Sequence, residues 1–531
     1  MITAGAVAAQ IQAEVRTRLR SPATLVAALA AFAGTLLWIP DPRGRVTSLS
    51  WISPAGHLVA PVYSSAYVGY AVTTVVTVLA TWFGFYLIAG AVRRDGERGV
   101  GVILAATPLS RWQYLLGKFA AHTVYLLLVA AMALGAGLVA FARFGVGPFS
   151  ARAFFVLPVA IAAPALAATA SLALLFDVTP GLRGRAGLVA WFFVFIILLV
   201  AVPTGAAGAS GGIPGRRPVL DPAGLATQTW LVRRTIPEAT SIATGLIVHD
   251  QPVRRVPWPG VSLSRGLVAL RAANLLFALA PLALAALVFN RFDPARAPRR
   301  WREGRRREAP SAAEPAPAVS SRPAELASLG STGSLRPSSI AAVVAEARMI
   351  WDCAGWIRWP LLVSALGAAA LPGPAVAAST AAFFLLLVPV ISECAAREEI
   401  AGTRGLVFSQ PAVPSSALAW KTASLAAFVL ALCFPAIVRA GAAAPVRGIE
   451  LTLGALFTAI LAAGCAWLTG GGKLFSALFL VLWYAAINRI PQADFAGAFS
   501  ASPRLAVTGV YVCAAIAVLV TARLFESSRN G

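Results

Sequence analysis

Long apolar stretches recur along the whole chain and are separated by short polar segments. A helix crosses a hydrocarbon core of about 30 Å with roughly 20 apolar residues, and only helices or closed barrels satisfy the backbone hydrogen bonds within lipid. The length of the stretches favours helices. Spans are predicted near 22–39, 66–91, 119–141, 153–176, 186–203 and 272–290, and again near 358–373, 375–392, 422–440, 449–468, 474–488 and 504–524.

This pattern predicts an all-α integral membrane protein with about 12 transmembrane helices, arranged as two pseudo-repeated six-helix halves. Residues 1–290 form the first half and residues 338–531 the second. Spans 358–373 and 474–488 are short, so a total of ten or eleven stays open. Residues 291–337 form a basic linker rich in Pro, Ala and Ser, without apolar periodicity, which we expect to be disordered.

Composition supports a membrane protein and argues against a nucleic-acid partner. Of the 531 residues, 58% are hydrophobic and only 12% are charged. A soluble domain needs more charged residues than this to keep its surface hydrated. The net charge of +23 comes from arginines that flank the spans or lie in the linker. Such an excess is typical of the positive-inside rule and of contact with anionic lipids.

The basic residues also predict an orientation with both termini in the cytoplasm of a bacterium and the spans in its inner membrane. The expected inside residues are Arg16, Arg18, Arg20, Arg93, Arg94, Arg98, Arg111, Lys118, Arg183, Arg185, the Arg291–Arg307 cluster of the linker, which is therefore cytoplasmic, and Arg397, Arg404, Lys421 and Lys473. The external loop 204–265 is long enough to translocate despite its arginines. Within it, residues 225–247 are expected to form short helices, and the matching segment 489–503 is much shorter.

The two halves share a sequence repeat. Each opens with an amphipathic helix, predicted at 3–20 and 338–357, that contains Ala-Glu-x-Arg at 13–16 and at 345–348. Each then has a charged segment between its second and third spans, at 93–118 and 396–421. Pro108 precedes Lys118 by the same spacing as Pro411 precedes Lys421, and the chain has only three lysines. A duplicated bundle predicts a pathway between the halves.

The two charged segments predict a short amphipathic helix at the membrane surface. Charged residues give way to a brief apolar run, 102–104 or 406–408, and a Pro-containing turn follows. The next helix is expected to begin at Ser110, or at Ser415 or Ser416, as the N-cap. Such a helix either docks a protein or rests on lipid headgroups.

The first charged segment resembles the ABC-2 family of transporter permeases, which have the type V exporter-like fold. The likeness is carried by Glu97-Arg98-Gly99, Thr107-Pro108-Leu109-Ser110-Arg111 and Gly117-Lys118. The second copy departs from the family pattern: Glu399 is followed by Ile400, Gln410 precedes Pro411, and Trp420 precedes Lys421.

The resemblance implies that the chain is the permease subunit of an ABC transporter, an exporter. In the family the charged segment is a coupling helix that rests on the ATPase, and the amphipathic helix is a connecting helix. Two six-span subunits usually dimerise, whereas this chain supplies both halves. The resemblance implies coupling roles for Glu97, Arg98, Gly99, Thr107, Pro108, Arg111, Lys118, Glu399, Arg404, Pro411 and Lys421.

No nucleotide-binding motif is present in the chain. The nearest candidate, Gly470 to Leu474, lacks both the first glycine and the Ser or Thr that would hold magnesium. We therefore expect no catalytic residue, cofactor or metal in this chain, and ATP and Mg²⁺ on a separate ATPase, in two copies. The alternatives are an ion-coupled secondary transporter and a non-transporting polytopic membrane protein. The cargo stays open.

Overall fold

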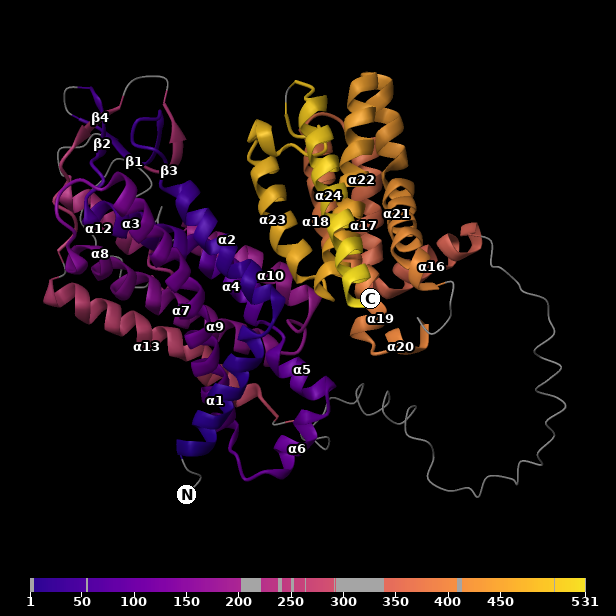
Figure 1. Ribbon diagram of the computed structural model, residues 1–531. Helices are drawn as coiled ribbons and strands as arrows, with labels where there is room; N and C mark the ends of the chain where they lie inside the picture. The colour runs from indigo at the N-terminus through magenta and orange to yellow at the C-terminus, as the bar shows by residue number, and fades with distance from the viewer. Residues whose placement is uncertain are drawn as a thin grey trace. The chain divides into compact units, whose positions relative to one another are not determined.

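The computed structural model describes residues 4–53, 56–201, 221–236, 241–249, 253–262, 264–290, 292, 339–407, 413–500 and 502–530. The chain divides into two compact units, Met1–Asp293 (unit 1) and Pro294–Gly531 (unit 2). Their border falls within the predicted linker 291–337, which lies outside the described residues except for residue 292. Helices make up most of the described chain (Figure 1).

Unit 1 consists of helices with a small sheet at one end. Three of its helices contain a π-helical turn, labelled η1 to η3, and one of these turns begins at Pro158, which has no backbone N–H to donate. The elements are α1 (Ala4–Leu19), α2 (Pro22–Trp38), β1 (Val46–Ile52), β2 (Leu58–Pro61), α3 (Ser65–Val75), η1 (Val76–Ala80), α4 (Thr81–Ile88), α5 (Ala91–Glu97), α6 (Val100–Ala106), α7 (Arg111–Phe144), α8 (Ala151–Leu157), η2 (Pro158–Ala162), α9 (Ala163–Val178), α10 (Arg185–Ile196), η3 (Ile197–Ala201), α12 (Leu225–Thr235), β3 (Ser241–Val248), β4 (Arg254–Val256) and α13 (Arg265–Val288).

The described part of unit 2 is helical. Its long helix α22 packs against both α21 and α24, and small residues allow the close approach: Gly448 faces Gly441 of α21, and Gly464 faces Leu519 of α24. The elements are α16 (Ser339–Cys353), η5 (Gly355–Ile357), α17 (Arg358–Ala370), α18 (Pro374–Ile391), η6 (Cys394–Ala396), α19 (Arg397–Ile400), α20 (Arg404–Val407), α21 (Val413–Ala443), α22 (Pro445–Thr469), α23 (Lys473–Ile487), η7 (Pro491–Ala493) and α24 (Leu505–Asn530).

Eight helices among the described residues are long and apolar enough to cross a membrane. Each coincides with a predicted span, because an apolar run of that length has few other stable conformations. They are Ser65–Glu97, Arg111–Phe144, Ala151–Val178, Arg265–Val288, Pro374–Ile400, Ala417–Ala443, Pro445–Thr469 and Leu505–Phe525.

The other four predicted spans are helical but do not pass the same test alone. Two belong to bent pairs, in which α1 meets α2 at 74° and α16 meets α17 at 101°. The remaining two are the shorter helices Arg185–Leu199 and Lys473–Ile487. At about 1.5 Å per residue such helices are shorter than a hydrocarbon core of about 30 Å. The described residues thus hold eight helices able to cross a membrane, or up to ten if each bent pair is one span, and twelve stays a prediction.

A four-stranded sheet in unit 1 corrects the all-α prediction. Its order is β3-β1-β2-β4, with β1 antiparallel to both neighbours and β2 parallel to β4. Short helices were expected over 225–247; α12 confirms the first part, but residues 241–248 form β3. The sequences of β1 and β3 are rich in Val, Ile and Thr, which favour strands, and each completes the other's hydrogen bonds.

A hydrophobic cluster in unit 1 joins the ends of four helices at the first charged segment. Val92 at the start of α5 and Tyr114 in the first turns of α7 pack with Leu174 of α9 and Ala285 of α13. The ring of Tyr114 stacks on that of Phe289, with centroids 5.3 Å apart. The segment 93–118 is therefore held at both of its ends by the same packed core.

Close contact between α3 and α8 depends on Gly69. A Cβ at this position would lie 2.3 Å from the carbonyl oxygen of Phe154, too close for any contact. We expect Gly69→Ala to lower the free energy of unfolding by about 1–3 kcal/mol, because the two backbones must separate. Gly135, in α7, has open space around its Cβ position, and Gly135→Ala is the matched control. Thermal unfolding in detergent compares the two, and equal stability would contradict the close approach.

Candidate functional site

The two charged segments have the same local shape. In unit 1, α5 ends at Glu97, Gly99 takes a φ of 75°, and α6 follows. In unit 2, α19 ends at Ile400, Gly402 takes a φ of 70°, and α20 follows. Only glycine adopts such φ values without strain. Gly99 and Gly402 also stand at the same distance in sequence before Lys118 and Lys421.

The helix starts after the two segments differ. Ser110 caps α7 as predicted: its hydroxyl accepts from the backbone N–H of Gln113, whose side chain bonds back to the backbone of Ser110. This reciprocal arrangement is a capping box. The N-cap predicted at Ser415 or Ser416 is wrong, because α21 already begins at Val413.

Glu14 of α1 lies at the centre of a buried group of charges in unit 1. Its carboxylate oxygens lie 2.9 Å from Arg18 Nη2, 3.1 Å from Arg94 Nη2 and 2.6 Å from Lys118 Nζ. Lys118 Nζ also lies 2.8 Å from Asp95 Oδ2. These five residues, the first ion cluster, join helix α1, the charged segment and the long helix α7.

Burial makes the pairing in the first ion cluster obligatory. The side chain of Lys118 is 4% exposed and that of Glu14 is 11% exposed. Burial alone would raise the pKa of Glu14, but the cations Lys118, Arg18 and Arg94 outweigh it and hold the pKa below its usual value of 4.5. A buried charge that loses its partner is strongly destabilising, so α1 and α7 depend on each other here.

Arg18 connects the first ion cluster to the C-terminal end of α4. It donates to the carbonyl oxygens of Leu87 (2.9 Å) and Ile88 (3.3 Å), the last residues of α4. A cation is favourable at a helix C-terminus, where carbonyls have no helical partner. Its Nη2 also lies 3.0 Å from His122 Nε2 of α7. Arg18 thus connects three helices.

A second group of buried charges occurs in unit 2. Arg397 Nη2 lies 2.9 Å from both carboxylate oxygens of Glu346 on α16. Lys421 Nζ lies 2.5 Å from Glu398 Oε2 and 3.9 Å from Glu346 Oε1, and its side chain is fully buried. These four residues form the second ion cluster.

The two clusters are built from residues at matching positions in the sequence. In each, a glutamate of the Ala-Glu-x-Arg motif, an arginine with an acidic neighbour, and the lysine of the next long helix come together. The Arg-acid pairs stand at the same spacing before their lysines. The matching residues are Glu14 and Glu346, Arg94 and Arg397, Asp95 and Glu398, and Lys118 and Lys421.

The clusters differ at the two outermost positions. Where unit 1 has Arg18 and His122, the matching positions of unit 2 are Ile350 and Leu425, both buried. The first ion cluster therefore has three cations for two carboxylates, and the second has two of each.

The residues predicted to couple to an ATPase fall into two groups. Lys118 and Lys421 belong to the ion clusters. The others that the structure describes lie at or near the surface of the charged segments, and Pro411 lies outside the described residues. The surface group consists of Glu97, Arg98, Gly99, Thr107, Pro108, Arg111, Glu399 and Arg404.

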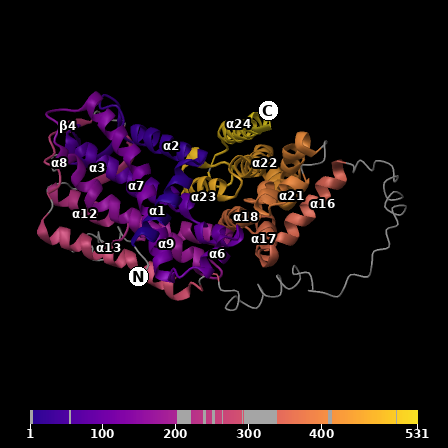
Figure 2. The same ribbon diagram turned by 60° about the horizontal axis from the view of Figure 1, so that its bottom comes forward.

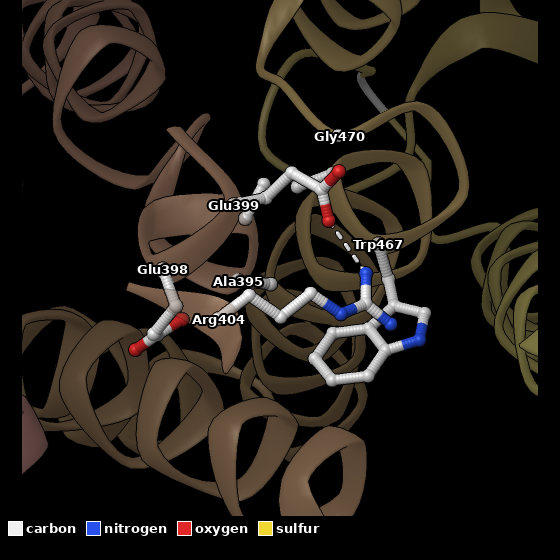
Figure 3. A pocket seen from close by; sticks show the side chains of 8 residues that line it. Ala395, Glu398, Glu399, Arg404, Trp467 and Gly470 are labelled. Carbon is white, nitrogen blue, oxygen red and sulfur yellow. Dashed lines mark hydrogen bonds and ion pairs between the residues drawn. The ribbon is translucent and has the colours of Figure 1, made fainter. Parts of the chain in front are cut away.

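Glu399 and Arg404 line a shallow pocket in unit 2 (Figure 3). Arg404 Nη1 lies 2.5 Å from Glu399 Oε2, and the guanidinium sits 5.9 Å from the centroid of the Trp467 ring. Gly470 forms the left-handed C-cap of α22 and lines the same pocket as Glu399. The glycine turn that only weakly resembled a nucleotide-binding loop thus lies beside the second charged segment.

The carboxylates of the clusters were not predicted as site residues. The Ala-Glu-x-Arg repeat contained Glu14 and Glu346. Helical periodicity relates only residues close in sequence, so it could not pair Glu14 with Lys118, which lies 104 positions later. The signal lay in burial: Lys118 and Lys421 lie within long apolar helices, and a buried lysine needs a carboxylate beside it. The equal spacing of Asp95 and Glu398 before these lysines would have identified one partner.

Comparison of the chain with protein-family models, curated proteins and solved structures finds no match. Within the described residues, no group of three or more His, Cys, Asp or Glu side chains is placed to hold a metal ion. The candidate site is thus defined by its own geometry: two buried ion clusters, each supporting a short surface helix.

Replacing the buried lysines tests the pairing. We expect Lys118→Met and Lys421→Met each to lower the free energy of unfolding by about 3–5 kcal/mol, because each removes a buried cation from its carboxylate partners. Arg111→Met, at an exposed position of the same helix as Lys118, is the control and should change stability little. Denaturant unfolding in detergent measures the differences, and a lysine variant as stable as the control would refute the clusters.

The lowered pKa of Glu14 predicts an acid dependence. A carboxyl group whose folded pKa is depressed stabilises the fold above its usual pKa of 4.5, and this contribution is lost as the pH falls through the folded value. The difference in melting temperature between wild type and Glu14→Gln should therefore be largest near neutral pH and shrink below pH 4.5. Glu97→Gln, which removes an exposed carboxyl, is the matched control, and its melting temperature should stay close to that of wild type. A constant difference for Glu14→Gln would contradict the ionised state.

Proposed function

We propose that this chain is the membrane permease of an ABC exporter, with two six-span halves in one polypeptide and ATP hydrolysis on a separate ATPase. The observation that carries the proposal is the duplicated arrangement of a short surface helix tied by a buried ion cluster to a long membrane helix. The resemblance of residues 97–118 to ABC-2 permeases supplies the identity of the partner.

The short helices expose apolar side chains where water-facing residues would be expected. Ile103 of α6 is 68% exposed and Leu406 of α20 is 78% exposed, and both stand at the same distance before their lysines. Val102, beside Ile103, is also exposed. An apolar residue on a charged surface is a common sign of a protein contact, and here it recurs at matched positions.

The buried ion clusters provide the mechanical connection that such a transporter needs. A force on α6 acts on α5, whose Arg94 and Asp95 are joined through Glu14 and Lys118 to α1 and α7. Separating these charges is costly in a low-dielectric setting, so the segment and the span move together. We assign the second cluster the same role for α19, α20 and α21.

Two ATPase subunits would bind, one under each half, and would carry ATP and Mg²⁺. Their dimerisation would bring the two coupling surfaces together and drive alternating access between the halves. In this proposal the charged segments and both termini face the cytoplasm, and the spans lie in a bacterial inner membrane. The cargo remains open.

Tagged chain purified from its native membranes should bring two copies of an ABC ATPase with it. Ile103→Asp and Leu406→Asp should each reduce the yield to about one copy, because a carboxylate in an apolar contact is desolvated without a partner. The double variant should retain none. Quantitative mass spectrometry of the purified complex measures the copy number.

Val248→Asp is the matched control, since Val248 is 74% exposed on β3, at the end of unit 1 opposite α6 (Figure 1). It should keep both ATPase copies. Wild-type chain without any ATPase, or a double variant with full ATPase content, would refute the proposal.

A further inference from the structure

The end of unit 1 that carries the sheet is strongly basic. β4, α3 and α8 lie together at this end in both views, and α6 lies at the other (Figure 1 and Figure 2). Among the described residues of this end, Asp41 is the exposed carboxylate, against several exposed arginines: Arg43, Arg45, Arg143, Arg152, Arg233, Arg234 and Arg254. Two of these arginines, Arg143 and Arg152, flank the connection between α7 and α8.

This connection, residues 141–155 or the α7–α8 corner, is held firmly against α3. The backbone N–H of Val146 donates to the carbonyl oxygen of Tyr63 at 3.0 Å, and that of Ser150 donates to Ser65 Oγ at 2.9 Å. The ring of Phe149 lies 5.3 Å from that of Phe141 and 5.7 Å from that of Phe154. The positions of the flanking arginines are therefore set by a packed corner.

Exposed apolar side chains surround the same corner. They lie on the last turns of α7, in the connection itself and on α8 and η2: Leu138, Val139, Val146, Phe149, Phe155 and Val159, with exposed fractions between 37% and 67%. The guanidinium of Arg143 sits 5.3 Å from the centroid of the Phe144 ring. An apolar helix surface thus meets cationic groups where two spans end.

We propose that the α7–α8 corner binds an anionic phospholipid, with its phosphate headgroup between Arg143 and Arg152 and its acyl chains along the exposed apolar face of α7, α8 and η2. Arginine presents several donors in a planar fork that matches phosphate oxygens. A soluble phosphate would use the arginines but not the apolar surface below them, so charge and hydrophobicity together select a lipid.

Topology adds a second reason. In the proposed orientation this corner is a short external connection, where the positive-inside rule disfavours arginine. Arginines kept there against that preference require a compensating interaction, and a phosphate headgroup supplies it. This second reason rests on the proposed orientation, but the arginines and apolar side chains of the corner do not depend on ATPase binding, so the lipid test and the ATPase test can fail separately.

A photo-crosslinking residue at the α7–α8 corner tests whether an anionic lipid binds there. The full chain, with Val146 (57% exposed) replaced by benzoylphenylalanine, is reconstituted in nanodiscs of equal parts phosphatidylglycerol and phosphatidylcholine. We expect phosphatidylglycerol to be captured in preference by at least about fivefold, the effect of one arginine near an anionic surface. In Arg143→Gln/Arg152→Gln the preference should disappear, at an unchanged melting temperature.

Three controls make the result specific. Benzoylphenylalanine at Ile516, midway along α24, should capture both lipids equally. Arg43→Gln/Arg45→Gln changes exposed arginines at the same end of unit 1 and should leave lipid capture at Val146 unchanged. If this variant lost the lipid preference equally, the cause would be the general positive charge of this end and not a site at the corner. Soluble glycerol phosphate should not compete. Competition by it, or equal capture of both lipids at Val146, would overturn the lipid site.

Discussion

The pairing of a buried lysine with carboxylates constrains the rest of the candidate site. Lys118 and Lys421 each lie in a long apolar helix and are withdrawn from water. An ammonium group in such surroundings is stable only beside an anion. Because the anions come from the amphipathic helix and from the charged segment, three elements distant in sequence must meet at that point. The short surface helices, α6 and α20, are then carried on a fixed base.

The same constraint is met differently in the two units, and the difference has a physical consequence. Ile350 and Leu425 are buried without any cost of desolvating charge, and the second ion cluster is balanced. Arg18 brings a further cation into the first cluster and is held by backbone carbonyls and His122. If both halves arose by duplication, they have kept the connection between segment and span but not its electrostatics. The two halves are therefore unequal as mechanical elements.

The helices that span a membrane could be located from sequence because about 20 apolar residues in lipid leave the backbone few choices. The sheet could not, because β1 and β3 are short and come from connections nearly 200 residues apart, so neither predicts its partner. In the site, Lys118 and Lys421 were found from their spacing and their rarity. Glu14 and Glu346 were visible as a repeat, but their contacts arise only from tertiary packing, on which local periodicity carries no information.

The location of the clusters at helix ends also limits where the proposed transporter can bend. A movement that opened a cluster would expose unpaired charge, so each charged segment and the adjoining turns of its span must move as one piece. Bending then falls farther along the spans. In unit 1 the span that leads into the charged segment has a π-helical turn at Val76–Ala80, and in unit 2 Pro389 and Pro435 lie in the helices on either side of the charged segment. Such interruptions weaken the helical hydrogen-bond ladder and are where helices kink. Each ion cluster thus holds the end of the span rigid, while the interrupted helix farther along can bend. This arrangement would convert a force on α6 or α20 into tilting of the span.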